Sequence, residues 1–330
     1  MATEPNINIL LVDDEPLVLQ SLSATFRRQY NIFTATNGKD AIEIVRQNHI
    51  HVVLSDQRMP GMLGHEVLRV IKTISPSTIR ILLTGYSDLD AIMNSVNSGE
   101  VFRFLTKPWK IDQLRDTVSA AVEIAKKVGQ LYPSKADIMR TGGAEPTEIV
   151  EQEEEPPPPP SGQKEGLLIV EFNKEQLQTM TQVFGKKYQV YPAASINEAF
   201  DQLSKHDIYV MLTDLNLNSE DGIDFLHAVK QEYPNIVIIL LTQVRDALLA
   251  IKSINEFQVY RYHVKPCAVE DLDKTIQSAM NRARTYRVQP LKNVAYVAKE
   301  VAPKLIEQQT TEKASWWRDK LRAAKKLFGK

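Results

Sequence analysis

The chain has 330 residues, of which 43% are hydrophobic and 25% charged, and its formal net charge is -1. This length accommodates about two domains with a core each. The totals do not favour a disordered chain, and the net charge excludes a chain that is basic throughout. One cysteine excludes an internal disulfide, no apolar run reaches the roughly 20 residues that cross a bilayer, and the first five residues do not resemble a secretory signal. We therefore expect a cytoplasmic protein.

In the first half, short runs rich in β-branched residues alternate with helical periods. The expected strands are 7–12, 32–35, 51–54, 79–83 and 102–105, and a helix follows each of them up to about Lys127. Strands of nearly continuous Val, Ile and Leu are buried on both faces. This pattern predicts an α/β domain over residues 1–128, a (βα)5 unit whose parallel sheet is covered by helices on both sides.

A linker without a usable hydrophobic period is expected over residues 129–165. It holds six glutamates between 145 and 155 with no Lys or Arg, and then five consecutive prolines, 156–160. Acidic repulsion and polyproline structure predict a semi-rigid spacer, and the alternative is a ligand for a proline-binding module. The βα rhythm then returns in residues 166–287, with strands expected at 167–170, 190–191, 209–212, 236–241 and 259–263.

The two halves repeat each other at a constant offset of 158 residues. The offset relates Asp13 to Glu171, Asp56 to Asp214, Thr84 to Thr242, Lys107-Pro108 to Lys265-Pro266, Gly64 to Gly222 and Leu114 to Leu272. A single insertion or deletion would have broken this register, so the halves are copies of one fold.

Polar residues follow four strands of the first half, at the edge where functional groups gather in a parallel sheet. Asp13 and Asp14 follow the first strand, Asp56 the third, Thr84 the fourth and Lys107 the fifth. Three crowded carboxylates favour a hard cation such as Mg²⁺. The set predicts phosphoryl transfer, with Asp56 as nucleophile, Asp14 as a direct metal ligand, Asp13 assisting through water, Lys107 as counter-charge and Thr84 as hydrogen-bond donor.

The segments LLVDDE, LSDQRMPGMLG, LLTGYSD and FRFLTKPW resemble a complete response-regulator receiver domain, and the resemblance covers about 120 residues in each half. It implies a flavodoxin-like fold with strand order 2-1-3-4-5 and a histidine kinase or histidine phosphotransfer protein as phosphoryl donor. It also implies that Phe104 is the aromatic switch residue, and that the small Gly85 keeps the pocket accessible to the donor.

The second half departs from this pattern at the metal site. Glu171 keeps a carboxylate, but Phe172 stands where Asp14 supplies a ligand, and a phenyl ring should fill the space of the ion. Asp214, Thr242 and Lys265 are retained, Gln243 replaces Gly85, and Tyr262 keeps the switch aromatic. We expect Mg²⁺ in the first domain only, an Asp214–Lys265 structural pair, and a pseudo-receiver that serves as a docking or dimerisation surface. The alternative is that Glu171 and a water rescue metal binding.

The tail, residues 288–330, ends in a basic segment. Residues 313–330 hold seven Lys or Arg and one Asp, and a helix there would align Trp317, Leu321, Ala324 and Phe328. Such a helix, with Trp316 beside the stripe, could lie on an anionic inner-membrane surface, dock into a partner protein or pack on its own second domain. Nucleic acid is a poor fit because no reading element accompanies the charge.

The leading hypothesis is a phosphorylation-dependent adaptor in two-component signalling, not an enzyme in the usual sense, that acts on a downstream protein. One alternative is a scaffold in which the receivers are binding modules and the tail sets location. Another is a phosphorelay sink that drains phosphoryl groups from a shared kinase.

Overall fold

The computed structural model describes residues 7–85, 101–129, 158, 164–213, 220–243, 247–301 and 312–327. The chain divides into two compact units, one formed by residues 1–152 with 300–305 and the other by 153–299 with 306–330. None of the helices in the described ranges is long and apolar enough to cross a membrane.

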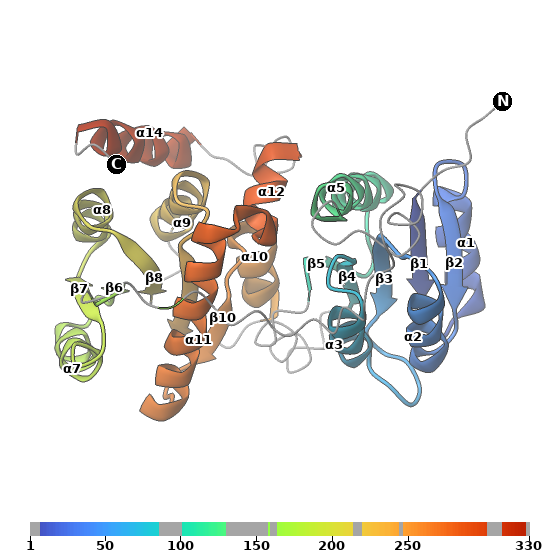
Figure 1. Ribbon diagram of the computed structural model, residues 1–330, viewed down its shortest axis with the longest axis horizontal. Helices are drawn as coiled ribbons and strands as arrows, with labels where there is room; N and C mark the ends of the chain where they lie inside the picture. Colours follow the sequence, from blue (N-terminus) through green and yellow to red (C-terminus); the bar gives the residue numbers. More distant parts are fainter. Residues whose placement is uncertain are drawn as a thin grey trace. The chain divides into compact units, whose positions relative to one another are not determined.

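The first unit is a five-stranded parallel sheet of order β2-β1-β3-β4-β5. Figure 1 shows α1 and α5 on one face of this sheet and α2 and α3 on the other. The elements in chain order are β1 (Asn8–Val12), α1 (Pro16–Phe26), β2 (Asn31–Ala35), α2 (Gly38–Gln47), β3 (Val52–Asp56), α3 (Gly64–Ile74), β4 (Ile79–Thr84), β5 (Arg103–Thr106) and α5 (Ile111–Gly129).

Local chemistry explains where the helices of the first unit begin. The Asn37 side chain caps α2 by accepting a hydrogen bond from the Asp40 backbone amide at 2.9 Å. At Gly64, the first residue of α3, an added Cβ would lie 2.0 Å from the Asp56 carbonyl oxygen. Glycine therefore allows α3 to approach the end of β3 closely, and this contact positions the residue that the sequence marks as the nucleophile.

The second unit repeats the architecture, with strand order β10-β9-β8-β6-β7. Ser195 caps α8 as Asn37, 158 residues earlier, caps α2. The elements are β6 (Gly166–Val170), α7 (Lys174–Phe184), β7 (Gln189–Ala193), α8 (Ile196–Lys205), β8 (Ile208–Thr213), α9 (Glu220–Glu232), β9 (Val237–Thr242), α10 (Ala247–Phe257), β10 (Arg261–Val264) and α11 (Val269–Val288). The prediction of two doubly wound α/β domains with flavodoxin-like strand order is confirmed.

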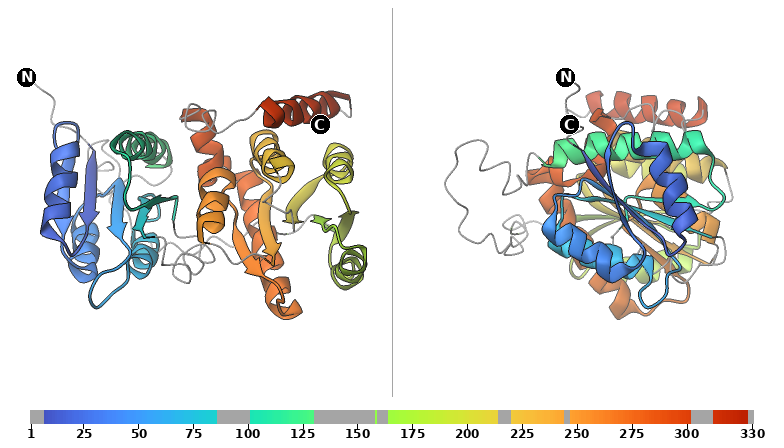
Figure 2. Two further views of the ribbon diagram at one scale, coloured as in Figure 1. Left: turned by 180° about the vertical axis from the view of Figure 1, so that it is seen from behind. Right: turned by 90° about the vertical axis from the view of Figure 1, so that its right-hand side faces the viewer.

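The tail continues as a 3-10 turn (Pro290–Lys292), α12 (Val294–Val301) and α14 (Glu312–Leu327). Helix α14 packs across α8 and α9 of the second unit, as the left view in Figure 2 shows. Trp317 is buried between Phe200 and Phe225, with ring centroids 6.1 and 5.7 Å apart, and Leu321 is fully buried.

This arrangement corresponds to the internal-packing alternative for Trp317 and Leu321. Trp316 remains 55% exposed. Phe328, which was expected to extend the stripe, lies outside the described residues.

Candidate functional site

The carboxyl ends of β1, β3, β4 and β5 bring the expected side chains of the first unit to one edge of the sheet. The Lys107 Nζ lies 2.5 Å from Asp56 Oδ1 and 3.2 Å from Asp13 Oδ2. Asp13 is fully buried and Asp56 nearly so. A single ammonium group therefore bridges two buried carboxylates.

Backbone amides fix the other oxygens of both carboxylates. The Arg58 amide donates to Asp56 Oδ2 at 2.7 Å, and the Glu15 amide donates to Asp13 Oδ1 at 2.9 Å. Each carboxylate thus has one oxygen held by the chain that follows its strand and the other directed at Lys107. Hydrogen bonds of this kind to a charged acceptor are short and strong, so they set the orientation of the Asp56 side chain.

Burial and charge act in opposite directions on the two central groups. Burial raises the pKa of Asp56, against the lowering effect of Lys107 and the Arg58 amide. Burial lowers the pKa of Lys107, but the Asp56 and Asp13 carboxylates outweigh it and leave that pKa above its usual value. Lys107 is therefore cationic at neutral pH and supplies a permanent positive charge beside Asp56.

The donor set at this edge suits a hard divalent ion. Mg²⁺ is commonly held by one or two carboxylates and completes its shell with water and phosphate oxygens, and Asp13 and Asp56 provide two adjacent carboxylates. Asp14, the expected direct ligand, is exposed to solvent. Within the described ranges no three acidic, His or Cys side chains already converge on one point. The chemistry of Asp13 and Asp56 fits Mg²⁺, whereas Asp14 adds only an exposed carboxylate at the rim.

Thr84 and Phe104 complete the set that the sequence predicted. Thr84 is fully buried at the end of β4, and its Oγ1 donates to the Gly85 carbonyl at 3.2 Å. Phe104 is buried on β5, with its backbone paired to Leu82 of β4. The hydroxyl therefore lies one strand away from Asp56, and the aromatic ring faces the core.

The corresponding edge of the second unit is closed by an ion pair. Lys265 Nζ lies 2.5 Å from Glu171 Oε2 and donates to Gln176 Oε1 at 3.0 Å. The Asn173 amide holds the other Glu171 oxygen at 2.8 Å. The expected Asp214–Lys265 pair stays a prediction, because Asp214 lies outside the described residues. The ion-pair partner that the described residues provide for Lys265 is Glu171.

Two of the other residues expected at the second edge lie where their counterparts lie in the first unit, and Phe172 differs from the expectation. Thr242 and Tyr262 are buried at the positions of Thr84 and Phe104. Phe172 is 43% exposed, so the ring does not fill an enclosed cavity as we expected. The physical reason is that Glu171 already occupies the interior by pairing with Lys265, which leaves the next side chain at the surface. Phe172 thus removes a carboxylate without plugging the site.

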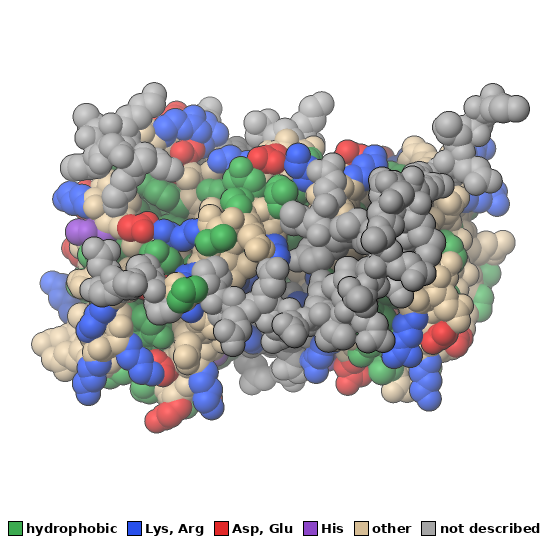
Figure 3. Space-filling view, in the orientation of Figure 1, with side chains coloured by type: hydrophobic (Ala, Val, Ile, Leu, Met, Phe, Trp, Pro, Cys, Tyr) green, Lys and Arg blue, Asp and Glu red, His purple; other side chains and the backbone are tan. Residues whose placement is uncertain are grey.

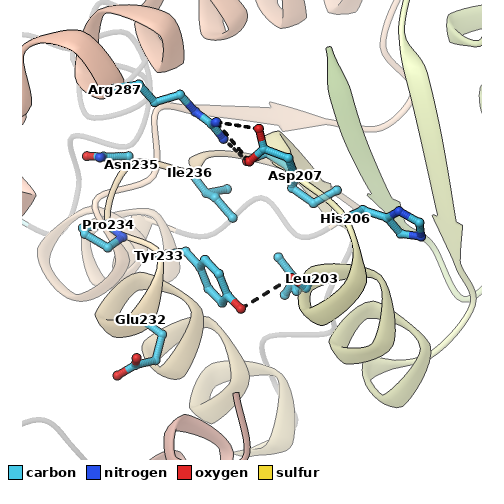
Figure 4. Close-up of a pocket in the computed structure, with 10 residues that line it drawn as sticks. Leu203, His206, Asp207, Glu232, Tyr233, Pro234, Asn235, Ile236 and Arg287 are labelled. Carbon is cyan, nitrogen blue, oxygen red and sulfur yellow. Dashed lines mark hydrogen bonds and ion pairs between the residues drawn. The ribbon is translucent and has the colours of Figure 1, made fainter. Parts of the chain in front are cut away.

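Sequence reasoning missed a cavity of about 540 Å³ at the opposite edge of the second unit's sheet. Figure 4 shows its wall, where Arg287 forms two hydrogen bonds to Asp207 at 3.0 and 2.8 Å and the Tyr233 hydroxyl donates to the Leu203 carbonyl at 3.4 Å. The tail supports the same wall, because Arg322 of α14 pairs with Glu232 at 2.7 Å. No sequence signal marks the cavity, since its residues come from three separate connections.

A partly buried lysine of α9 was also missed. Lys230 Nζ donates to the carbonyls of Pro234 and Ile236 at 3.3 and 3.0 Å. Burial, together with the charge of Arg282, lowers the pKa of Lys230 from 10.5 to about 7. A lysine in a helix usually indicates a solvent-exposed face, so only the packing against the following turn reveals this one.

Comparison with known proteins explains the paired architecture. The family model described as "Response regulator receiver domain" matches residues 9–119 and again 167–277. The chain belongs to the response regulator receiver family. Both halves are receivers, and tandem receivers place the chain in phosphorylation-dependent two-component signalling.

Each of the similar proteins matches a stretch of this chain about as long as one receiver domain. The hydrogenase transcriptional regulatory protein HoxA of Bradyrhizobium diazoefficiens is 30% identical over 41% of this chain and 28% of its own length. Sporulation initiation phosphotransferase F of Bacillus subtilis is 38% identical over 34% of this chain and 91% of its own. The chain thus spans little more than a quarter of HoxA. A solved signal receiver domain of an HD domain-containing protein from Pseudomonas fluorescens Pf-5 is 32% identical, covering 38% of this chain and 93% of that one with a TM-score of 0.36.

Proposed function

We propose that the first receiver accepts a phosphoryl group on Asp56 from a histidine kinase or a histidine phosphotransfer protein. The observation that carries this proposal is the buried cluster in which Lys107 bridges Asp56 and Asp13. Two carboxylates that converge on one cation at the carboxyl edge of a parallel sheet match the requirements of phosphoryl transfer, which are positioning and charge neutralisation.

The residues have distinct roles in the proposed step. A carboxylate oxygen of Asp56 attacks phosphorus, the phosphorus–nitrogen bond of the donor phosphohistidine breaks, and the electron pair leaves on the imidazole nitrogen. Lys107 neutralises charge on the phosphoryl oxygens, and Thr84 turns its hydroxyl toward them. Asp13 and Asp56, with Asp14 at the rim, would hold Mg²⁺, which supplies further charge neutralisation when it is bound. Phe104 then reports the state of the edge through its position on β5.

The second receiver is proposed to be a degenerate copy that binds no Mg²⁺ and takes no phosphoryl group. Its lysine is held by Glu171 and Gln176, and Phe172 offers no ligand where Asp14 stands in the first receiver. The first-receiver lysine pairs with the phosphoacceptor Asp56 itself, whereas the described carboxylate partner of Lys265 is Glu171, which corresponds to Asp13. The alternative, metal binding by Glu171 through water, would require this ion pair to open.

The output is proposed to be protein–protein interaction by a cytoplasmic adaptor that is not itself an enzyme. Phosphorylation of the first receiver would bias its β5 face, while the second receiver and the tail offer a docking surface for a downstream protein or a second copy of the chain. On the face shown in Figure 3, Lys and Arg side chains are interspersed with acidic ones, which favours a protein partner over nucleic acid.

Membrane binding by the tail is the second candidate for its role. Trp316 is 55% exposed and lies on α14 beside Lys320, whose Nζ is 5.0 Å from the centre of that ring. An exposed indole with cations around it is a feature of interfacial helices. However, Trp317 and Leu321 are already buried against α8 and α9, so the apolar stripe would have to undock before it could enter a bilayer.

One set of variants separates the adaptor from its alternatives. Phosphoryl transfer from a phosphorylated histidine phosphotransfer protein is followed in the wild type, Asp56→Asn and Asp214→Asn, together with the cellular output and localisation. The adaptor predicts that Asp56→Asn abolishes transfer and output but leaves localisation unchanged. An unaffected output would support the scaffold, whereas fast transfer and hydrolysis without any effect on partner binding would support the sink.

A further inference from the structure

A second cavity, of about 770 Å³, lies between α7 and α11 of the second receiver, at the end of β9. Helices α7 and α11 cover the same face of this sheet (Figure 1). The residues that line the cavity include the apolar Met180, Val183 and Leu241 and the thiol-bearing Cys267. A cavity of this size with an apolar wall and a few polar groups has the properties of small-molecule sites.

The internal repeat shows what distinguishes this place in the second receiver. Cys267 lies 158 residues after Trp109, so a thiol stands where the first receiver has an indole. The Trp109 ring centre lies 6.0 Å from the Nζ of Lys107, and Lys265, the equivalent of Lys107, lines the cavity. The second receiver therefore has a small thiol where the first has a large flat side chain beside the equivalent lysine. The space that it leaves suits a flat aromatic group.

Charge restricts the ligand further. The ammonium of Lys265 is neutralised by Glu171 at 2.5 Å and also donates to Gln176. Glu175 lines the same cavity and adds a second carboxylate, so Lys265, its partner Glu171 and Glu175 together carry a net negative charge. Among the described residues that line the cavity, Lys265 is the one cation and it is already paired with Glu171, so a carboxylate-bearing ligand is disfavoured. A neutral or cationic ligand would not be repelled.

We propose that the second receiver binds a neutral or cationic flat aromatic small molecule in the cavity between α7 and α11. This role goes beyond the phosphoryl chemistry of the first receiver and does not depend on it. The aromatic ring packs against the apolar wall in the space that corresponds to the indole of Trp109, and polar substituents meet Glu175 and the amide of Gln243 at the rim. Binding would give the degenerate receiver an input of its own.

The chain's only cysteine makes occupancy directly measurable. Burial, with the charge of Asp271, raises the pKa of the Cys267 thiol, so labelling by a disulfide reagent is done at mildly alkaline pH. The probes are indole, the cationic tryptamine and the anionic indole-3-acetate. We expect indole and tryptamine to slow labelling of the full chain, and indole-3-acetate to have little effect. Equal or stronger protection by indole-3-acetate would overturn the charge argument.

Substitutions test the position of the site by calorimetry. Cys267→Trp restores the indole of the first receiver and should weaken tryptamine binding by at least about tenfold. Cys267→Ser keeps the cavity open and should bind as the wild type does. Should Cys267→Trp fail to fold, Thr179→Trp narrows the same cavity from α7 and must give the same loss. The proposal would be refuted by unchanged tryptamine binding in a folded Cys267→Trp or Thr179→Trp protein, or by the absence of indole and tryptamine binding to the wild type. Phosphorylation of Asp56, measured in each variant, is the independent control for the first receiver.

Discussion

Replacement of Trp317 by alanine should release α14 from the second receiver. The side chain is 7% exposed and packs between Phe200 and Phe225. Truncation of a buried tryptophan to alanine typically destabilises by about 3–5 kcal/mol. The Trp317 indole N–H is buried without a hydrogen-bond acceptor in the described part of the chain, and such a donor already costs about 1–3 kcal/mol. We therefore expect the lower end of the range, about 3 kcal/mol.

Hydrogen exchange measured by mass spectrometry over residues 312–327 provides the assay. A loss of about 3 kcal/mol corresponds to exchange faster by on the order of a hundredfold in α14. Trp316→Ala is the matched control, because that side chain is 55% exposed and its removal should change exchange by less than about fivefold. Unchanged protection of α14 in Trp317→Ala, or equal effects of the two substitutions, would show that the tail is not held by this contact.

Three further changes test other parts of the structure. Lys107→Met leaves two buried carboxylates without their counter-charge and should destabilise the first receiver by about 3 kcal/mol, seen as faster exchange in β1 and β3; unchanged exchange would contradict the ion-pair assignment. By the same readout, Gly64→Ala should destabilise the first receiver by about 1–3 kcal/mol, because the added Cβ meets the Asp56 carbonyl. Gly129→Ala is the control, since its Cβ meets no atom within 4 Å and should have little effect. Similar results for the two substitutions would argue against the close approach of α3 to β3. Burial lowers the pKa of Lys230 from 10.5 to about 7, so at this residue the unfolded state binds more protons than the folded state between these values. The contribution of Lys230 to the stability of the second receiver therefore rises with pH over this range. Lys230→Met should remove this contribution, which amounts to about 1.4 kcal/mol per pH unit. The free energy of unfolding is measured with urea at about pH 7.5 and pH 9.5, and an equal change between these pH values in the wild type and in Lys230→Met would contradict the prediction.

Much of the fold and of the first site could be predicted because parallel strands end at a shared edge. Asp13, Asp56, Thr84 and Lys107 follow different strands in the sequence, and strand order alone brings them together. The offset of 158 residues extended the same geometry to the second receiver. The offset predicted Lys265 at the edge of the second sheet, but it did not indicate that Lys265 would form an ion pair with Glu171.

The remaining features depend on packing that periodicity does not encode. An apolar stripe with Trp317 and Leu321 fits any apolar surface, and only the structure shows that α8 and α9 supply it. The exposure of Phe172 follows from the Glu171–Lys265 pair, which no local pattern reveals. The cavity beside Cys267 is visible in the sequence only as the loss of an aromatic residue between two copies.

The most direct test of the central claim is to map acyl phosphate on the full chain. The protein is incubated with Mg²⁺ and a small-molecule phosphodonor, and the modified residue is identified by mass spectrometry in the wild type, Asp56→Asn and Asp214→Asn. The account predicts one phosphoryl group on Asp56, lost in Asp56→Asn and retained in Asp214→Asn. Modification that survives Asp56→Asn and disappears in Asp214→Asn would reverse the roles of the two receivers and contradict the account.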